Sequence, residues 1–394
     1  MSPAGYQSVI VRRGCAETTD AVTASAATRN HTTGRHFMVN TTPPRPCLVV
    51  SPISWPPDPL LAMLPLAVTP GARPRGLPCQ RAKNIAGSTG RMRMRLGVIV
   101  AYARVHFGDE PTLEQYGAFA DWAAQMQFAG IELAAFSLDH FARDFSDSQR
   151  LQRFRDHCQA KGLAITAFEA GFLRHMTVHQ DPAVRAQAVT EVRKSVQVAR
   201  SLGTDLIYLH SAPHPSWTIE FRRLYDEFSP PTRVEVPVEF SWDAAWAEYV
   251  GVIRDLVREA EAGGVRLALE VRPYEMVSNA DGGRRLADAV GSPALGLVFD
   301  TAHFLVQKEL LPVAIEKLRD RIFLVHLADN DGITDYHWAP GKGAVPWDGT
   351  LGALRKIGYA GFANIDVAGT YQDIDAEIRA GRDFILARLA GASR

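Results

Sequence analysis

From residue 95 onward, short apolar runs alternate with longer segments in which apolar residues recur every three or four positions. A short apolar run bounded by Gly, Pro or polar residues is typical of a buried strand, whereas the longer spacing indicates an amphipathic helix. We predict strands at 96–102, 130–136, 163–170, 206–210, 266–271, 295–300, 322–327 and 362–367. Helices are predicted after them at 113–127, 147–160, 183–202, 242–262, 284–290, 311–318, 350–357 and 374–389.

Strict alternation of strand and helix predicts a parallel sheet, because each right-handed crossover returns the chain to the same end of the sheet. Eight such units fit a (β/α)₈ TIM barrel, an α/β fold, and this is the predicted fold class of residues 94–394. A doubly wound open sheet is the alternative. It is disfavoured because the segment after the first strand, 102–106, contains no Gly-rich phosphate-binding loop.

Residues 1–93 have a different composition and lack sustained periodicity. They contain 12 of the 24 prolines and 11 basic residues against 3 acidic ones. The most apolar piece, 47–68, is interrupted by five prolines, which excludes an ordinary transmembrane helix. We expect a disordered extension, or a spurious one translated from a start codon placed too early, since Met92 and Met94 immediately precede the first predicted strand.

The net charge and the positions of the cysteines limit the binding partners and the cellular location expected for the predicted barrel. Residues 94–394 carry 32 basic and 40 acidic residues, and this net negative charge argues against binding to nucleic acid. Only Cys158 of the four cysteines lies there, so a disulfide framework is excluded and a cytoplasmic location is expected. We predict no membrane partner, while assembly into a homo-oligomer stays open.

Four predicted strands, consecutive along the chain, each carry an acid or imidazole near the carboxyl end. A single buried residue of this kind is often a structural polar group with a local partner. Four at equivalent positions indicate one site, because the carboxyl ends of barrel strands meet on one face. Three carboxylates and one imidazole favour Mn²⁺, Mg²⁺ or Co²⁺, with Zn²⁺ also compatible. The four residues are Glu270, Asp300, His326 and Asp366.

At these residues the chain resembles a known family. Residues 95–391 resemble the xylose isomerase-like barrels, which include tagatose 3-epimerase, hydroxypyruvate isomerase and myo-inosose dehydratase, with endonuclease IV as a distant relative. The motifs that carry the resemblance are Ala268-Leu269-Glu270, Phe299-Asp300-Thr301-Ala302-His303, Val325-His326-Leu327-Ala328-Asp329-Asn330-Asp331, and Asp335-Tyr336-His337 leading to Pro340-Gly341-Lys342-Gly343.

The resemblance implies that Glu270, Asp300, His326 and Asp366 bind one divalent metal ion. It also implies that Glu270 and Asp366 are the catalytic residues that move the proton. The epimerases of this family have Glu at the last ligand position, so Asp366 is one methylene shorter. They also have Arg where this chain has Gly332.

Five further residues are predicted to contact substrate: His303, His210, Glu169, Glu275 and His337. His303 is a substrate contact or a second-metal ligand, with a loop histidine facing water as the alternative. Glu169 contacts substrate or orients a ligand, unless it forms a salt bridge to a neighbouring strand. Glu275 matches a second glutamate of the epimerases only with a one-residue shift.

Other polar and aromatic residues are expected to be structural. Glu132, in the second predicted strand, is interpreted as a structural acid. Trp242 and Trp246 have the i, i+4 spacing of a helix face and are expected to pack in the core. The segment 212–240 lies on the catalytic face by topology, where it could be a lid or an insertion with a packing role.

The predicted reaction is proton transfer next to the carbonyl of a ketose, keto-polyol or related small sugar, through an enediolate stabilised by the metal. Isomerisation, epimerisation and, as in inosose dehydratase, elimination of water all remain open. Schiff-base chemistry is excluded because no lysine of the barrel lies inside a predicted strand. The alternatives from other classes are a multi-metal phosphodiesterase acting on abasic DNA and a sugar-binding barrel without catalysis.

Overall fold

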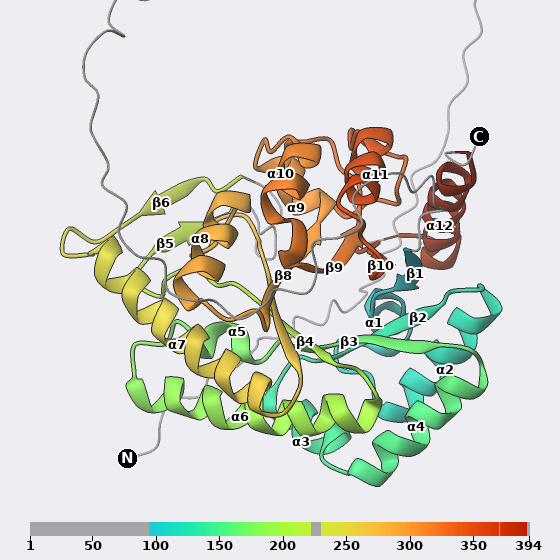
Figure 1. The fold of residues 1–394 in the computed structure, drawn as a ribbon, viewed down its shortest axis with the longest axis horizontal. Coiled ribbons are helices and arrows are strands. Elements are labelled where there is room, and N and C mark those ends of the chain that lie inside the picture. Colours follow the sequence, from blue (N-terminus) through green and yellow to red (C-terminus); the bar gives the residue numbers. More distant parts are fainter. Residues whose placement is uncertain (1–93, 222–229, 370, 392–394) are drawn as a thin grey trace, which may run out of the picture. The chain divides into compact units, whose positions relative to one another are not determined.

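The chain forms a closed barrel of eight parallel strands, as predicted, in a computed structural model that describes residues 94–221, 230–369 and 371–391. The order around the ring is β1, β10, β9, β8, β7, β4, β3, β2, and Figure 1 shows the helices packed outside it. The predicted extension, residues 1–93, lies outside the described residues. The strands are β1 (Arg95–Val98), β2 (Gly130–Ala135), β3 (Ala164–Ala170), β4 (Leu206–His210), β7 (Arg266–Glu270), β8 (Leu295–Asp300), β9 (Ile322–Leu327) and β10 (Phe362–Ile365).

Each predicted helix is present, with ends shifted by a few residues. The helices are α2 (Leu113–Gln125), α4 (Ser148–Ala160), α6 (Pro182–Leu202), α7 (Trp242–Ala262), α8 (Ala280–Val290), α10 (Leu311–Leu318), α11 (Trp347–Lys356) and α12 (Ile374–Gly391). Local chemistry fixes several of the ends. Asp181 accepts from the Ala183 amide before α6, and Gly203 ends that helix with φ 77°.

Several short elements were not predicted. They are α1 (Ala101–Phe107), α3 (Leu138–Phe145), α5 (Leu173–Met176), α9 (Thr301–Val306), the 3₁₀ turn η1 (Arg319–Arg321), and an antiparallel hairpin of β5 (Thr218–Glu220) and β6 (Arg233–Glu235). The first predicted strand is also shorter than expected, since its apolar run continues into α1. An apolar run alone does not distinguish a buried strand from a buried helix.

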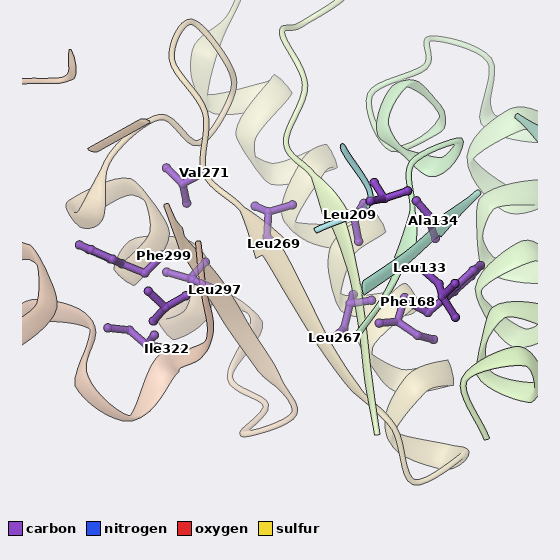
Figure 2. Packing of buried hydrophobic residues seen from close by; sticks show 14 of the residues in the cluster. Leu133, Ala134, Phe168, Leu209, Leu267, Leu269, Val271, Leu297, Phe299 and Ile322 are labelled. Atoms are coloured by element: carbon purple, nitrogen blue, oxygen red, sulfur yellow. The ribbon is translucent and has the colours of Figure 1, made fainter. Parts of the chain in front are cut away.

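The two faces of the barrel wall belong to different apolar clusters. Leu267, Leu269, Leu297 and Phe299 join the large cluster between the strands and the helices, and Figure 2 shows their side chains. A smaller cluster contains the alternate residues Ala268, Val298 and Leu324, together with Tyr208. Because side chains alternate along a strand, this second cluster fills the inside of the barrel.

A helix that crosses a membrane must be both long and predominantly apolar. Among the residues that the structure describes, none of the helices is both long enough and apolar enough to cross a bilayer.

Candidate active site

The candidate metal ligands continue the inward-facing rows of the barrel. Glu270 comes two residues after Ala268, Asp300 two after Val298, and His326 two after Leu324. A spacing of two keeps a side chain on the same face of a strand. The apolar rows that fill the barrel therefore end in polar side chains at its carboxyl face.

These rows bring four side chains into one cluster. One ligand atom from each of Glu270, Asp300, His326 and Asp366 lies within 4.8 Å of the others. The His326 Nδ1 atom lies 2.9 Å from Glu270 Oε1, 3.6 Å from Asp366 Oδ2 and 3.9 Å from Asp300 Oδ2. A second group with the same spacing limit consists of Asp300, His303 and His337.

The two carboxylate oxygens of Asp300 have different surroundings. Oδ1 accepts hydrogen bonds from the amides of Ala302, at 2.6 Å, and His303, at 3.0 Å, and so begins α9. Oδ2 is buried without a hydrogen-bond partner. A buried carboxylate oxygen without a partner is costly. Its position beside two carboxylates and an imidazole fits a divalent cation at this cluster.

Imidazoles offset part of the negative charge. Burial raises the pKa of Asp300 to about 6, against the influence of His303 and His337. Burial also acts to raise the pKa of Asp366, but the charge of His337 and its hydrogen bond outweigh burial and lower the pKa to about 2. Burial opposes protonation of His337, yet Asp366 and Asp300 raise its pKa to about 10. The cluster thus attracts positive charge.

Glu132 lies on the other side of His326. Its Oε2 is 3.0 Å from His326 Nε2 and accepts from Asn364 Nδ2 at 2.8 Å, while Oε1 accepts from the Tyr208 hydroxyl at 2.5 Å. A carboxylate at the far nitrogen of a metal-binding histidine fixes the ring and its tautomer. This contact could not be predicted from the sequence, because Glu132 precedes His326 by 194 residues.

A cavity of about 160 Å³ opens beside the cluster. His210 borders it, with Nε2 2.7 Å from Glu270 Oε2 and 3.3 Å from Glu169 Oε1. Glu169 of β3 and His210 of β4 therefore both reach the cluster, and their ion pair is the salt bridge to a neighbouring strand that was the alternative for Glu169. The cavity is lined by Ile99, Val100, Ala101, Arg104, Glu132, Phe136, Glu169, Tyr208, His210, Glu270, Arg272, His303, His326, His337, Asp366 and Ala368.

His303 and His337 are buried side by side at this cavity. His303 lies in α9 with 3% of its surface exposed, which contradicts the alternative of a loop histidine facing water. Its Nδ1 is 2.7 Å from Asp335 Oδ2, and its ring centre is 4.8 Å from that of His337. His337 Nδ1 is 3.1 Å from Asp366 Oδ1.

Glu275 does not line this cavity. It lies in a neighbouring one, where its Oε1 accepts from Arg174 Nη2 at 2.5 Å. Arg272 lines both cavities and was not predicted. It follows Glu270 by two residues, so the spacing rule that relates the ligands to the barrel interior could have found it. No comparable pattern marks Arg174.

A third, larger cavity of about 600 Å³ lies between α3, α4 and α6. Its lining includes Phe141, Leu151 and Lys194 and none of the predicted site residues. Chemistry, not volume, therefore decides which cavity is the candidate active site.

The sequence of the chain is similar to those of known proteins. The profile of the xylose isomerase-like TIM barrel family matches residues 120–388, and the chain belongs to that family. A curated relative, D-psicose 3-epimerase of Enterocloster bolteae, is 25% identical over 301 residues, which cover 74% of this chain and 88% of the relative. Relatives of this kind are epimerases and isomerases, and the chain is an enzyme of that class.

Two solved structures share the fold. The structure of L-ribulose 3-epimerase matches with a TM-score of 0.60 and 19% identity, over 76% of this chain and 95% of that one. The IOLI protein, solved with a bound zinc atom, matches with a TM-score of 0.57 and 19% identity, over 76% and 99%.

Proposed function

We propose that the protein is a divalent-metal-dependent sugar isomerase or epimerase that moves a proton next to the carbonyl of a ketose, a keto-polyol or a related small sugar. One observation carries the proposal. Glu270, Asp300, His326 and Asp366 converge in one cluster, three of them line the cavity beside it, and a buried oxygen of Asp300 in this cluster has no hydrogen-bond partner. The relationship to D-psicose 3-epimerase supports a sugar as the substrate.

Glu270 and Asp366 would be the proton-transfer residues. Glu270 ends β7 and Asp366 follows β10, and β8 and β9 separate these two strands in the ring. Two carboxylates on separated strands can face one substrate carbon from different sides. One would remove the proton and the other would return it, which inverts the carbon or moves the carbonyl.

The metal would be held by Glu270, Asp300, His326 and Asp366. When bound, a divalent cation supplies Lewis-acid stabilisation of the negative charge that develops on the carbonyl oxygen of an enediolate. The oxygen-rich set favours Mn²⁺, Mg²⁺ or Co²⁺, while the zinc atom in the IOLI protein keeps Zn²⁺ in the proposal.

The surrounding polar side chains would position the sugar. His303, His210, Glu169 and His337 line the cavity and would contact substrate hydroxyls, while Glu275 would act from the neighbouring cavity. The proposal places the enzyme in the cytoplasm, as expected because Cys158 is the single cysteine among residues 94–394.

The test is proton exchange with solvent. The Mn²⁺-loaded full chain would be incubated with a panel of ketoses and inososes in deuterated water, and deuterium next to the carbonyl would be measured by NMR. We expect incorporation that is lost with Glu270→Gln or Asp366→Asn and after chelation of the metal. Loss of water in the same assay would identify a dehydratase. No exchange with any candidate, metal being bound, would contradict the proposal.

The second cluster favours one other candidate function. Asp300, His303 and His337, with Asp335 beside His303, could hold a further metal ion, as a multi-metal phosphodiesterase requires. The net negative charge of residues 94–394 opposes binding to a DNA backbone. Several metal ions per chain together with cleavage of an abasic duplex would favour this candidate over the isomerase.

A further inference from the structure

We infer that the natural substrate is larger than a free ketose, and that a second sugar ring, joined to the reacting sugar by a glycosidic bond, occupies the cavity beside the candidate active site. We call the cavity at the metal cluster the inner cavity and its neighbour the outer cavity. The inference rests on the proposed function, because it takes the reacting sugar to lie in the inner cavity.

The outer cavity has a volume of about 280 Å³ and adjoins the inner one. Arg272 lines both cavities. His303 of the inner cavity also pairs with Asp335 of the outer cavity, at 2.7 Å. A substrate at the metal cluster can therefore extend past Arg272. The outer cavity is lined by Arg174, His175, Pro213, Trp217, Ile219, Phe221, Arg272, Pro273, Tyr274, Glu275 and Asp335.

Size favours a substrate that uses both cavities. Pockets for small ligands usually have volumes of about 300–1,000 Å³. The inner cavity, at about 160 Å³, is below this range, and the outer cavity is larger than the inner one. The outer cavity therefore offers more space for a substrate than the inner cavity does by itself.

Aromatic rings form part of the outer wall. Phe221 and Tyr274 meet edge to face with centroids 5.9 Å apart. The ring centre of Trp217 lies 5.6 Å from that of Phe240, edge to face, and 6.4 Å from that of Trp242, on which it stacks. Aromatic faces with nearby polar groups suit a ligand that is apolar on one face and polar at its rim, as a sugar ring is.

Polar groups at the same wall can take up hydroxyl groups. Trp217 Nε1 and Glu275 Oε2 are buried and have no hydrogen-bond partner among the described residues. Buried donors and acceptors usually have partners, and a polyhydroxylated ligand offers both kinds.

The charges of the outer cavity favour a neutral ligand. Glu275 Oε1 lies 2.5 Å from Arg174 Nη2 and 4.0 Å from Arg272 Nη1. Asp335 is paired with His303. A phosphate group on the ligand would compete with Glu275 for the guanidinium groups of Arg174 and Arg272. An ammonium group on the ligand would compete with these two arginines for the Glu275 carboxylate. A glycosyl unit keeps these ion pairs intact.

The probe is 6-O-glucosylfructose, compared with fructose and with fructose 6-phosphate. Deuterium exchange and calorimetric binding would be measured with the Mn²⁺-loaded full chain. We expect the glucosyl ketose to give about tenfold higher kcat/KM and about tenfold tighter binding than fructose. Trp217→Ala should reduce this preference about five- to tenfold, since a packed aromatic contact is worth about that much.

Phe323→Ala is the matched control. It removes an aromatic ring near the start of β9, at the other end of the barrel from the cavities, where Arg266 lies over the ring at 4.7 Å. This variant should keep the wild-type preference even if it is less stable. A change in preference equal to that of Trp217→Ala would overturn the assignment of the outer cavity.

The other outcomes separate the inference from the proposed function. Equal rates and affinities for fructose and its glucosyl derivative would overturn the inference while exchange itself supports the isomerase. Preference for fructose 6-phosphate would overturn it in favour of an anionic group. If no probe exchanges but the glucosyl ketose binds in a Trp217-dependent way, the proposed function fails, and only the assignment of the outer cavity as a glycosyl-binding site stands.

Discussion

Glu132 and Arg272 lie next to the candidate ligands, and both line the inner cavity. Arg272 continues the inward-facing row of β7 beyond Glu270, so its place follows from strand periodicity. The link between Glu132 and His326 joins β2 and β9, which are three places apart in the ring and far apart in the sequence. The ligand set could be predicted because its members share one position in successive strands. Contacts across the barrel have no such pattern.

Glu132→Gln should weaken metal binding. The substitution keeps the size of the side chain but removes the carboxylate that faces His326 Nε2 at 3.0 Å. Loss of such an outer partner typically costs about ten- to a hundredfold in metal affinity. Competition with a chromophoric chelator would measure the dissociation constant for Mn²⁺.

Glu191→Gln is the matched control for Glu132→Gln. Glu191 is also a buried glutamate, but it lies on α6 and pairs with Lys194 at 2.8 Å. Its substitution should leave the Mn²⁺ dissociation constant unchanged. Equal metal affinities in wild type and Glu132→Gln would show that Glu132 does not hold the ring of His326.

At the scale of elements, length decided what could be predicted. Long helices such as α6 and α7, with 21 residues each, have a clear apolar stripe and recognisable caps. The strands β5 and β6 have three residues each and are largely exposed, so no alternation marks them. α9 was missed because the strand before it ends in the residue that caps it.

Thr112→Ala should destabilise the protein by about 1 kcal/mol through α2. The Thr112 hydroxyl accepts from the Gln115 amide, and the Gln115 side chain accepts from the Thr112 amide, which is a complete capping box. Urea denaturation would measure the free energy of unfolding. Thr190→Ala, the same change at an exposed position within α6, should leave it nearly unchanged. Equal effects of the two substitutions would contradict a capping role.

The free energy of unfolding should depend on pH through His140, a buried residue of α3. The Nε2 atom of this buried residue lies 2.9 Å from the Pro111 carbonyl oxygen, and Nδ1 accepts from the Phe136 amide at 3.4 Å. Both contacts suit a neutral ring protonated at Nε2. Burial lowers the pKa of His140, although the Pro111 carbonyl and nearby carboxylates act to raise it.

The folded state therefore takes up this proton at lower pH than the unfolded chain does. The stability that comes from neutral His140 is complete above its ordinary pKa and is lost as pH falls through the lowered one. Relative to His140→Gln, the wild type should lose part of its advantage in unfolding free energy between about pH 7.5 and about pH 5. A constant difference between the two proteins across this range would exclude His140 as the cause.

At the scale of the whole molecule, the barrel was the most predictable feature. Eight alternating units leave few topologies, and the closed ring of eight strands follows from them. The outer cavity was the least predictable feature, because residues from the connection between β4 and α7 form part of its lining. Side chains there come from segments distant in sequence, and only the folded chain shows that Trp217 and Glu275 line one cavity.

A chain that starts at Met92 should keep the function of the full chain. Residues 1–93 contain none of the candidate site residues, and the family profile matches residues 120–388. The shortened chain should show the same thermal midpoint, Mn²⁺ affinity and deuterium exchange as the full chain. A lower midpoint would mean that the extension packs on the barrel. The intact mass of the natively expressed protein would decide whether the extension is made at all.

The double task of Asp300 constrains how this enzyme can evolve. One oxygen begins α9 and the other faces the cluster, so under the proposed function catalysis and folding would select the same side chain. Asn in place of Asp300 could still cap α9 but would lack the negative charge. Glu would keep the charge, but it is a poorer N-cap residue than Asp. A descendant that changes its metal or its reaction is therefore freer to alter Glu270 or Asp366, neither of which caps a helix in the described chain. Of the four candidate ligands, Asp300 should be the one that is substituted least often during evolution.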